Sequence, residues 1–284
     1  MPELPEVEVL VRHLRPLLQN QTVQGVEVRR ARVLRPTSVE DLARTLRGAR
    51  FVGLSRRGKY LLFNLRVPRG QNPVLLLGHL GMTGRIYLLP AASELPKHAA
   101  VVLALKRQKL VFEDTRYFGR LTLATGAVQK LGPEPLSGEF CPDGFAQALK
   151  RSKQAVKIKL LDQTLVAGVG NIYASEALFR ARISPRVPAR NLTRQQARRL
   201  WQAIRQVLAE AIDCGSTVPL NFSGRGERDG LFYFGRAPEA PDYYTERLRV
   251  YDRAGQPCPR CGAVIRRLVQ AARSTFYCPR CQRR

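Results

Sequence analysis

The chain has 284 residues, of which 44% are hydrophobic, so it is long enough to bury the cores of two domains. Its 48 Lys and Arg residues against 22 Asp and Glu residues give a formal net charge of +26, which indicates a polyanionic partner. No apolar run approaches the roughly 18 residues that cross a bilayer, and the N-terminus lacks a secretory signal, so we expect no membrane association.

The chain begins Met1-Pro2-Glu3, with Glu6 one helical turn further on. Removal of Met1 would expose the secondary amine of Pro2, and an α-amino group with a pKa of about 7.7–8.0 is partly neutral at pH 7. Amines attack carbonyl carbons, and a secondary amine gives an iminium cation, an electron sink that promotes elimination. Taken alone, however, this stretch favours an ordinary helix start, where proline and acids are common.

Apolar residues recur at three- and four-residue steps over 7–18, which predicts an amphipathic helix that Pro16 should kink or end. From 22 to about 125 the pattern changes to short strands, interrupted by a helix that Ser38 and Asp41 cap. Many strands with few crossover helices predict an antiparallel β-sandwich. The predicted strands include 23–28, 51–54, 60–65, 74–77, 101–105 and 110–112.

The second half of the chain reads as helical. Prolines and glycines cluster at 131–138, which predicts a linker. Helices are predicted at 143–152, 154–163 and 171–182, and a fourth begins at the Thr193–Gln196 capping box and ends near Gly215, with Trp201 in the core. The stretch 216–249 lacks periodicity and predicts a long loop.

Four of the six cysteines form two C-x-x-C knuckles separated by sixteen residues. This spacing is typical of a tetrahedral zinc site with a hairpin, here 264–268 with 275–277, between the knuckles. Four protein ligands indicate a structural metal, and a segment this short must take folding free energy of about 10 kcal/mol from it. The predicted ligands are Cys258, Cys261, Cys278 and Cys281. Cys141 and Cys214 carry no motif and read as structural.

Gly168 and Gly170 precede the helix predicted to begin at Asn171. They would expose backbone N–H groups at a helix N-terminus, which suits a phosphate. A dinucleotide-binding fold is the competing interpretation, but the preceding segment looks helical and no acid lies near position 188. Ordinary packing of a turn on a helix also fits these glycines.

Two loops of the β-rich half carry Met82, Arg116 and Phe118 between glycines. Exposed Met and Phe side chains suit a wedge that fills the space left when a nucleotide is extruded from a duplex, and arginine can hydrogen-bond the base left behind. Packing in the core is the alternative for Met82 and Phe118.

Four parts of the chain resemble, in this order, the formamidopyrimidine-DNA glycosylase family of the bacterial type: PELPEVE, the loops HLGMTG and DTRYFG, GVGNIYASEALF, and the Cys₄ finger. The resemblance implies excision of 8-oxoguanine and formamidopyrimidines from duplex DNA, followed by β- and δ-elimination. The catalytic residues it implies are Pro2 as nucleophile, Glu3 as acid/base group, Lys59 beside the proline, and Arg273 on a phosphate. The DNA contacts it implies are His98, Lys157 and Asn171 on phosphates, and Met82, Arg116 and Phe118 in the helix.

This chain departs from the family in one of these motifs. The family usually has DPRRFG where this chain has DTRYFG. Thr115 and Tyr117 therefore put the stiffness of the loop and one backbone-contacting cation in question.

The fold implied is α+β: an N-terminal antiparallel β-sandwich with an N-terminal helix, then a helix–two-turns–helix domain and a zinc-finger hairpin with one structural Zn²⁺ per chain. The predicted segments are the catalytic sandwich 1–132, linker and first helix 133–150, DNA-binding helices 151–220, lesion-capping loop 221–247 and finger 248–284. We expect a cytoplasmic monomer, bound to damaged double-stranded DNA at the nucleoid.

Two alternatives stay open. An enzyme of the endonuclease VIII type would prefer oxidised pyrimidines, and PELPEVE argues against it because it is the purine-type N-terminus. A non-catalytic zinc-finger DNA-binding protein of the same fold is disfavoured because Pro2 and Glu3 are intact.

Overall fold

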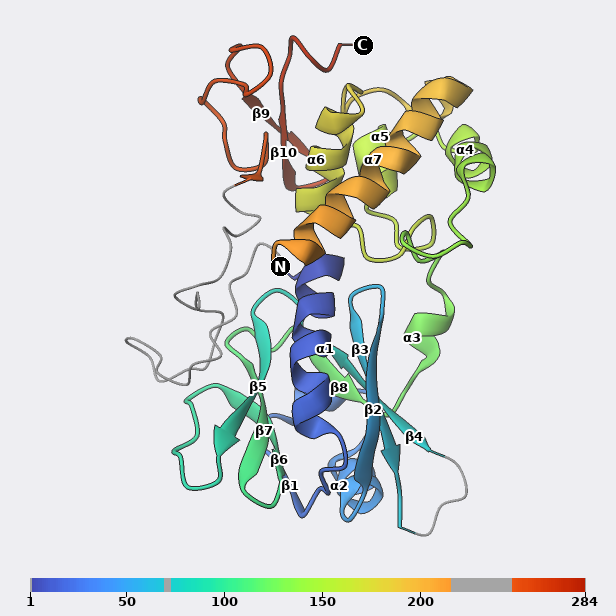
Figure 1. The fold of residues 1–284 in the computed structure, drawn as a ribbon. Coiled ribbons are helices and arrows are strands. Elements are labelled where there is room, and N and C mark those ends of the chain that lie inside the picture. Colours follow the sequence, from blue (N-terminus) through green and yellow to red (C-terminus); the bar gives the residue numbers. More distant parts are fainter. Residues whose placement is uncertain (1, 69–72, 216–246, 284) are drawn as a thin grey trace. The chain divides into compact units, whose positions relative to one another are not determined.

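The computed structural model describes residues 2–68, 73–215 and 247–283, which form two compact units (Figure 1). The first unit comprises Pro2 and 6–129, and the second comprises 3–5, 130–215 and 247–283. Apart from Arg247, the predicted loop 221–247 lies outside the described residues. None of the described helices is both long enough and apolar enough to cross a bilayer.

Helix α1 (Leu4–Leu18) buries the apolar stripe that its sequence predicts, including Val7, Leu10, Val11 and Leu14. It does not end at Pro16, as one reading of the sequence predicted, but continues to Leu18. Pro16 removes one N–H donor from the helix, but Leu14 and Leu18 on either side of it are buried, and this packing holds the last turn in place.

The first unit contains two four-stranded antiparallel sheets. One has the order β1 (Gly25–Val28), β6 (Ala99–Ala104), β7 (Gln108–Asp114), β5 (Gly84–Pro90), and the other β2 (Arg50–Arg57), β3 (Tyr60–Arg66), β4 (Val74–His79), β8 (Arg120–Thr122). Helix α1 runs between the two sheets (Figure 1), and a single apolar core takes side chains from α1 and from both sheets, which confirms the predicted sandwich. Strands β5 and β8 were not among the predicted strands, and β8, with three residues, is too short to show a period.

Short helical elements complete this unit. They are the 3₁₀ helix η1 (Ala31–Leu34), α2 (Val39–Leu46) and α3 (Gly126–Gln129). The predicted cap of α2 is confirmed, because the hydroxyl of Ser38 accepts a hydrogen bond from Asp41 N at 3.0 Å.

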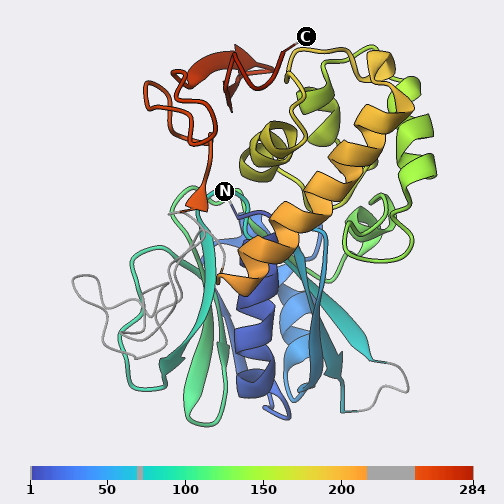
Figure 2. The ribbon, with the colours of Figure 1, turned by 45° about the horizontal axis from the view of Figure 1, so that its top comes forward.

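The second unit is helical, and its elements are α4 (Pro142–Lys150), α5 (Val156–Leu160), α6 (Asn171–Arg180), the 3₁₀ helix η2 (Ala189–Asn191) and α7 (Arg194–Asp213). Both hydrogen bonds of the Thr193–Gln196 capping box are present at the start of α7. Figure 2 shows α7 crossing beside α6, and apolar residues of α4 to α7 form one core. Trp201, predicted in this core, is half-buried and donates its indole N–H to Phe140 O at 2.7 Å.

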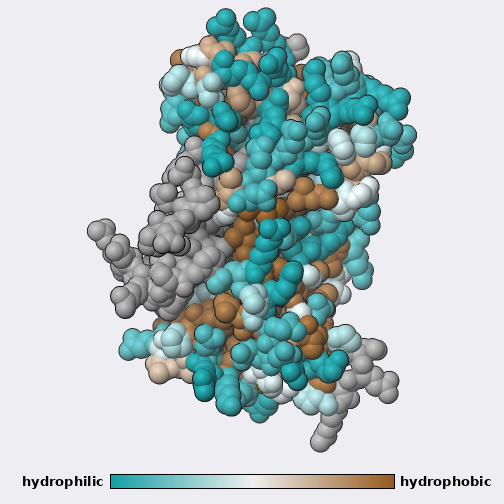
Figure 3. Space-filling view, in the orientation of Figure 1, coloured by the Kyte–Doolittle hydropathy of each residue, from teal (hydrophilic) through white to brown (hydrophobic). Residues whose placement is uncertain are grey.

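The C-terminal hairpin pairs β9 (Arg266–Gln270) with β10 (Arg273–Tyr277) in antiparallel register, Leu268 opposite Thr275. This confirms the predicted hairpin but shifts its first strand by two residues. Val264 instead bridges Pro257 next to the first knuckle. In Figure 3 hydrophilic side chains dominate the visible surface of this second unit, as its many arginines require.

Candidate active site and zinc finger

The carboxylate of Glu3 lies buried at the N-terminus of α6. Glu3 Oε1 accepts a hydrogen bond from Ile172 N at 2.9 Å, and Oε2 accepts a longer one from Tyr173 N at 3.4 Å. The sequence suggested that these exposed N–H groups would cradle a phosphate. They hold a carboxylate of the chain itself instead, because the positive end of a helix favours any anion that reaches it.

Two glycines allow this close approach. A Cβ atom on Gly170 would lie 2.3 Å from Glu3 Cδ, and one on Gly168, whose φ is +86°, would lie 2.6 Å from Leu4. Leu4 N also donates to Gly168 O at 3.1 Å. The Gly168–Gly170 turn and the start of α6 therefore form a binding site for the N-terminal residues, which we call the seat of Glu3. It fixes a carboxylate on the residue that follows Pro2.

A buried lysine lies beside this turn. Lys157 is 0% exposed and donates from Nζ to Asn171 Oδ1 at 2.5 Å, while Asn171 Nδ2 donates to Ser274 O at 2.9 Å. Burial and, to a smaller extent, the positive charge of Arg273 lower the pKa of Lys157 to about 8, although the negative charge of Glu3 opposes both. The structure thus brings Glu3, Lys157, Asn171 and Arg273 into one electrostatically coupled group.

Tyr251 joins this group, although no pattern in the sequence pointed to it. Its hydroxyl shares a hydrogen bond with Asn171, and burial raises the pKa of Tyr251. Its ring lies 5.1 Å from that of Phe276. The segment is held by Glu176, a buried carboxylate on α6 that accepts hydrogen bonds from the backbone nitrogens of residues 249, 250 and 251 at 2.8–2.9 Å. An acid inside the apolar string ASEALF was the available signal for Glu176.

In the first unit, Lys59 is buried within the β2–β3 turn. Burial, together with the positive charges of Lys59 and Arg120, lowers the pKa of His79 to about 4, so the imidazole is neutral at pH 7. His79 Nδ1 accepts a hydrogen bond from Gly81 N at 3.1 Å. Lys59 and His79 therefore lie in one neighbourhood at the base of the loop that carries Met82.

Met82 and Phe118 project from their loops with 47% and 44% of their surface exposed, so packing in the core is wrong for both. The guanidinium carbon of Arg116 lies 4.8 Å from the centre of the Phe118 ring. Tyr117, between Arg116 and Phe118 in the chain, adopts a left-handed backbone conformation with φ of +53°. His98 Nδ1 lies 3.5 Å from its hydroxyl, so the structure places His98 beside this loop.

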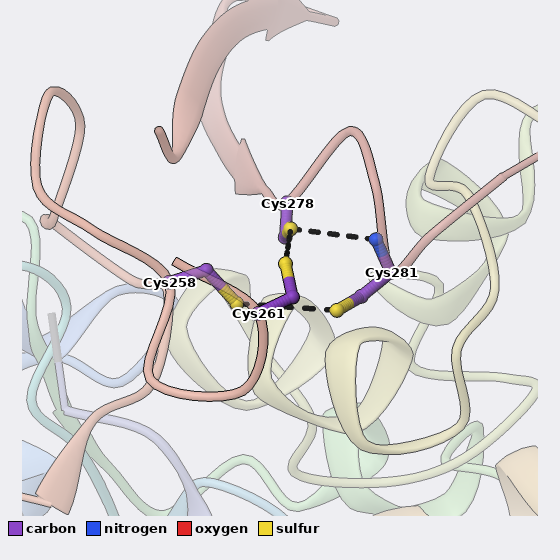
Figure 4. A group of neighbouring side chains, drawn as sticks. All are labelled: Cys258, Cys261, Cys278 and Cys281. Carbon is purple, nitrogen blue, oxygen red and sulfur yellow. Dashed lines mark hydrogen bonds between the residues drawn. The ribbon is translucent and has the colours of Figure 1, made fainter. Parts of the chain in front are cut away.

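The four predicted zinc ligands converge (Figure 4). Their sulfur atoms all lie within 4.8 Å of one another, with Cys261 and Cys278 at 3.5 Å and Cys258 and Cys281 at 4.0 Å. Tetrahedral zinc with Zn–S bonds of about 2.3 Å requires sulfurs about 3.8 Å apart. This donor set fits one structural Zn²⁺ and leaves no position for a substrate.

Three family models match the chain. They are the formamidopyrimidine-DNA glycosylase N-terminal domain over residues 1–121, the formamidopyrimidine-DNA glycosylase H2TH domain over 131–221, and the zinc finger found in FPG and IleRS over 255–284. Together with the sandwich, the helical bundle and the Cys₄ hairpin, these matches place the chain in the class of zinc-finger DNA glycosylases.

Relatives share the whole length of the chain. The formamidopyrimidine-DNA glycosylase of Thermus thermophilus is 45% identical, covering 99% of this chain and 98% of the relative, and that of Carboxydothermus hydrogenoformans is 38% identical over 100% of both. The crystal structure of the Thermus thermophilus protein has a TM-score of 0.82 at 43% identity, covering 99% of this chain and 98% of that one. The chain belongs to the formamidopyrimidine-DNA glycosylase family.

A second similar solved structure is that of Lactococcus lactis Fpg in a complex with DNA containing an abasic site. It has a TM-score of 0.87 at 32% identity and covers 99% of this chain and 100% of that one. The comparisons confirm the family, the α+β fold class and the single structural zinc that the sequence predicted.

Proposed function

We propose that this chain is a bifunctional DNA glycosylase and AP lyase that excises 8-oxoguanine and formamidopyrimidines from duplex DNA in base excision repair. The names of its full-length relatives support this activity, as do similar solved structures described as complexes with DNA that contains an abasic site or Fapy-dG. The observation that carries the proposal is the seat of Glu3, which fixes a carboxylate next to the one secondary amine that removal of Met1 would expose.

In the proposed reaction the Pro2 nitrogen attacks C1′ of the damaged nucleotide and displaces the base. The resulting iminium withdraws electrons from the sugar, so that β-elimination and then δ-elimination break the strand on both sides of the lesion. Glu3 transfers protons as the sugar ring opens. Backbone N–H groups at the positive end of α6 stabilise its ionised form, and their rigidity keeps the carboxylate in place between steps.

The cationic residues around this site are proposed to bind the DNA backbone. Lys157, Asn171 and Arg273 already share one cluster, which suits adjacent phosphates on a single strand. From the β-rich unit, His98 is proposed to contact a phosphate, and Lys59 to contact the DNA near the Pro2 nucleophile. Contacts of this kind position the enzyme and carry no sequence information.

Recognition of an extruded nucleotide is proposed to use Met82, Arg116 and Phe118. Apolar side chains that are nearly half exposed at loop tips are costly in water, and they suit the space between base pairs. Arg116, whose guanidinium lies over the Phe118 ring, would hydrogen-bond the base opposite the lesion. We propose that the enzyme acts as a monomer on nucleoid DNA in the cytoplasm.

A second substrate class has one supporting observation. A similar solved structure of Lactococcus lactis Fpg is described as a complex with DNA containing an oxidised pyrimidine. The test is single-turnover excision of 8-oxoguanine and of thymine glycol from otherwise identical duplexes. We expect faster release of 8-oxoguanine, whereas a clear preference for thymine glycol would favour the endonuclease VIII type of specificity, and no release of either base would contradict the proposed activity.

A further inference from the structure

The two loops that carry the exposed wedge side chains lie against each other. The first joins β4 to β5 through residues 80–83, and the second joins β7 to β8 through residues 115–119. A Cβ atom on Gly81, whose φ is +59°, would lie 2.7 Å from Gly119 N and 2.8 Å from Phe118 C. Contact between the two backbones this close means that neither loop can move without displacing the other.

One carboxylate is hydrogen-bonded to both loops. Asp114, the last residue of β7, is 0% exposed. Its Oδ1 accepts hydrogen bonds from Thr83 Oγ1 at 2.6 Å and from Arg116 N at 3.1 Å, and its Oδ2 accepts one from Gly119 N at 2.7 Å. Thr83 belongs to the first loop, and Arg116 and Gly119 belong to the second.

These bonds fall next to the wedge residues. Thr83 follows Met82, Gly119 follows Phe118, and the third donor is the backbone N–H of Arg116 itself. The carboxylate therefore fixes each of the three side chains at the residue itself or at its neighbour. In the described part of the chain no lysine or arginine forms an ion pair with Asp114, so its buried charge is balanced by three neutral donors alone. Such an arrangement is unfavourable for stability compared with apolar packing, which argues that it serves a function.

The backbone of Asp114 also contacts His98, which is proposed to bind a phosphate. Asp114 N donates to His98 O at 3.1 Å, and the imidazole of His98 lies beside the hydroxyl of Tyr117. Tyr117 also lies beneath the guanidinium of Arg30, 5.5 Å from the ring centre. These contacts hold a non-glycine residue in a left-handed conformation between Arg116 and Phe118, which turns the two side chains out of the loop.

The geometry points to Asp114 as a positioning residue that locks Met82, Arg116 and Phe118 into one preformed wedge. This inference rests on the proposed function, because it assumes that the three side chains enter the duplex. Asp114 does not touch DNA. It acts by keeping the wedge ordered before the encounter, so that extrusion of the damaged nucleotide does not require the loops to rearrange first.

The test compares variants that change one hydrogen bond at a time. Asp114→Asn keeps the shape but places an amide donor against one of the three donors, and Thr83→Val removes the hydroxyl bond alone. Thr83→Ser restores that hydroxyl. Glu113→Gln is the matched control, since Glu113 is the adjacent buried acid and its carboxylate accepts from Tyr87 OH at 2.8 Å. Thermal unfolding of all four proteins verifies that they are folded at the assay temperature.

Three rates and one signal are measured for each variant. They are single-turnover excision of 8-oxoguanine opposite cytosine and opposite adenine, strand cleavage at a preformed abasic site, and fluorescence of 2-aminopurine placed opposite the lesion. We expect Asp114→Asn to slow excision by on the order of 10–10²-fold, because misplacing a reacting partner by about 1 Å has effects of that size. Cleavage at the abasic site should fall by less than about threefold, because no base has to be unstacked.

Thr83→Val should show a smaller loss in the same direction, with recovery in Thr83→Ser, and the 2-aminopurine signal of wedge insertion should fall in parallel. Wild-type excision and fluorescence in both Asp114→Asn and Thr83→Val would overturn the inference, as would an equal loss in Glu113→Gln. Arg116→Ala and Phe118→Ala distinguish failure of the positioning role of Asp114 from failure of the wedge itself. If they lose excision while Asp114→Asn does not, only the positioning role fails; if they are also unaffected, the wedge in the proposed function fails with it.

Discussion

The zinc finger and the seat of Glu3 are both sites built around short motifs, but they form in opposite ways. The finger takes four ligands from 24 consecutive positions, 258–281, and its geometry follows from their spacing. The seat joins residue 3 to residues 168–173, and it exists only when the helical unit has folded. A local metal site can therefore be recognised from spacing, whereas a site assembled across 170 positions needs the structure. The two meet at Asn171, whose Nδ2 donates a hydrogen bond to Ser274 O in the hairpin of the finger.

Removal of the metal should have the largest effect, because it removes one of these regions entirely. Cys278→Ser, or chelation, should unfold the finger, whose folding free energy depends on zinc by on the order of 10 kcal/mol. DNA binding should be abolished while the β-rich unit keeps its cooperative unfolding transition. Metal analysis and calorimetry check this, with Cys214→Ser as the control. An active protein without zinc would contradict it.

Glu3→Gln tests the other region with almost no change in shape. The amide oxygen can still accept from Ile172 N, so the seat should stay occupied, but the group can no longer transfer a proton. Base excision should fall by about 10²–10⁴-fold. Single-turnover kinetics measure the loss, and Glu8→Gln, on the helix that follows Glu3, is the control, because Glu8 pairs with Arg12 and Arg56 instead. Similar losses in both variants would remove the special role of Glu3.

Lys157 links the two regions, and its titration should make both the DNA affinity and the free energy of unfolding depend on pH. Its pKa of about 8 means that the charge is lost as the pH rises from 7 to 9, so DNA affinity should fall over that range and Lys157→Met should flatten the fall. The unfolded chain holds this proton up to a pKa of about 10.4, so the free energy of unfolding should rise between pH 8 and 10 in wild type relative to Lys157→Met.

Two titrations check this prediction: DNA binding by fluorescence anisotropy, and denaturant unfolding at each pH. At fixed pH, Lys157→Met and Arg273→Ala should each reduce the slope of log affinity against log salt by about 0.9. Asn171→Ala carries no charge change and should leave that slope intact while weakening all duplexes equally. Identical pH profiles for wild type and Lys157→Met would contradict the assignment.

Arg116→Ala should have the smallest effect on affinity and the largest on discrimination. Loss of one base contact costs about 1–3 kcal/mol against the wrong base, so the ratio of excision rates opposite cytosine and opposite adenine should change more than the dissociation constant does. Lys153→Ala, another basic change in a loop, serves as the control. Equal losses opposite every base would argue against insertion of Arg116.

How much of the structure can be predicted from the sequence depends on how far apart in the chain the interacting residues lie. The sandwich, the N-cap of α2, the capping box of α7, the hairpin and the zinc ligands follow from patterns within a few residues, and the structure confirms them. The occupant of the Gly168–Gly170 turn was predicted wrongly, because nothing local says that Glu3 fills it. Tyr251 was missed for the same reason: its partner Asn171 is about 80 positions away. Strand β8 is too short to have a period.

The most direct test of the central claim is borohydride trapping on a duplex with 8-oxoguanine, followed by peptide mapping. We expect one covalent adduct, on the N-terminal peptide that begins at Pro2, and we expect an uncleaved N-terminal tag to abolish both trapping and strand cleavage while lesion binding persists. Efficient trapping by the tagged protein, with the adduct on Lys59, Lys157 or another lysine, would contradict the assignment of Pro2 as the nucleophile.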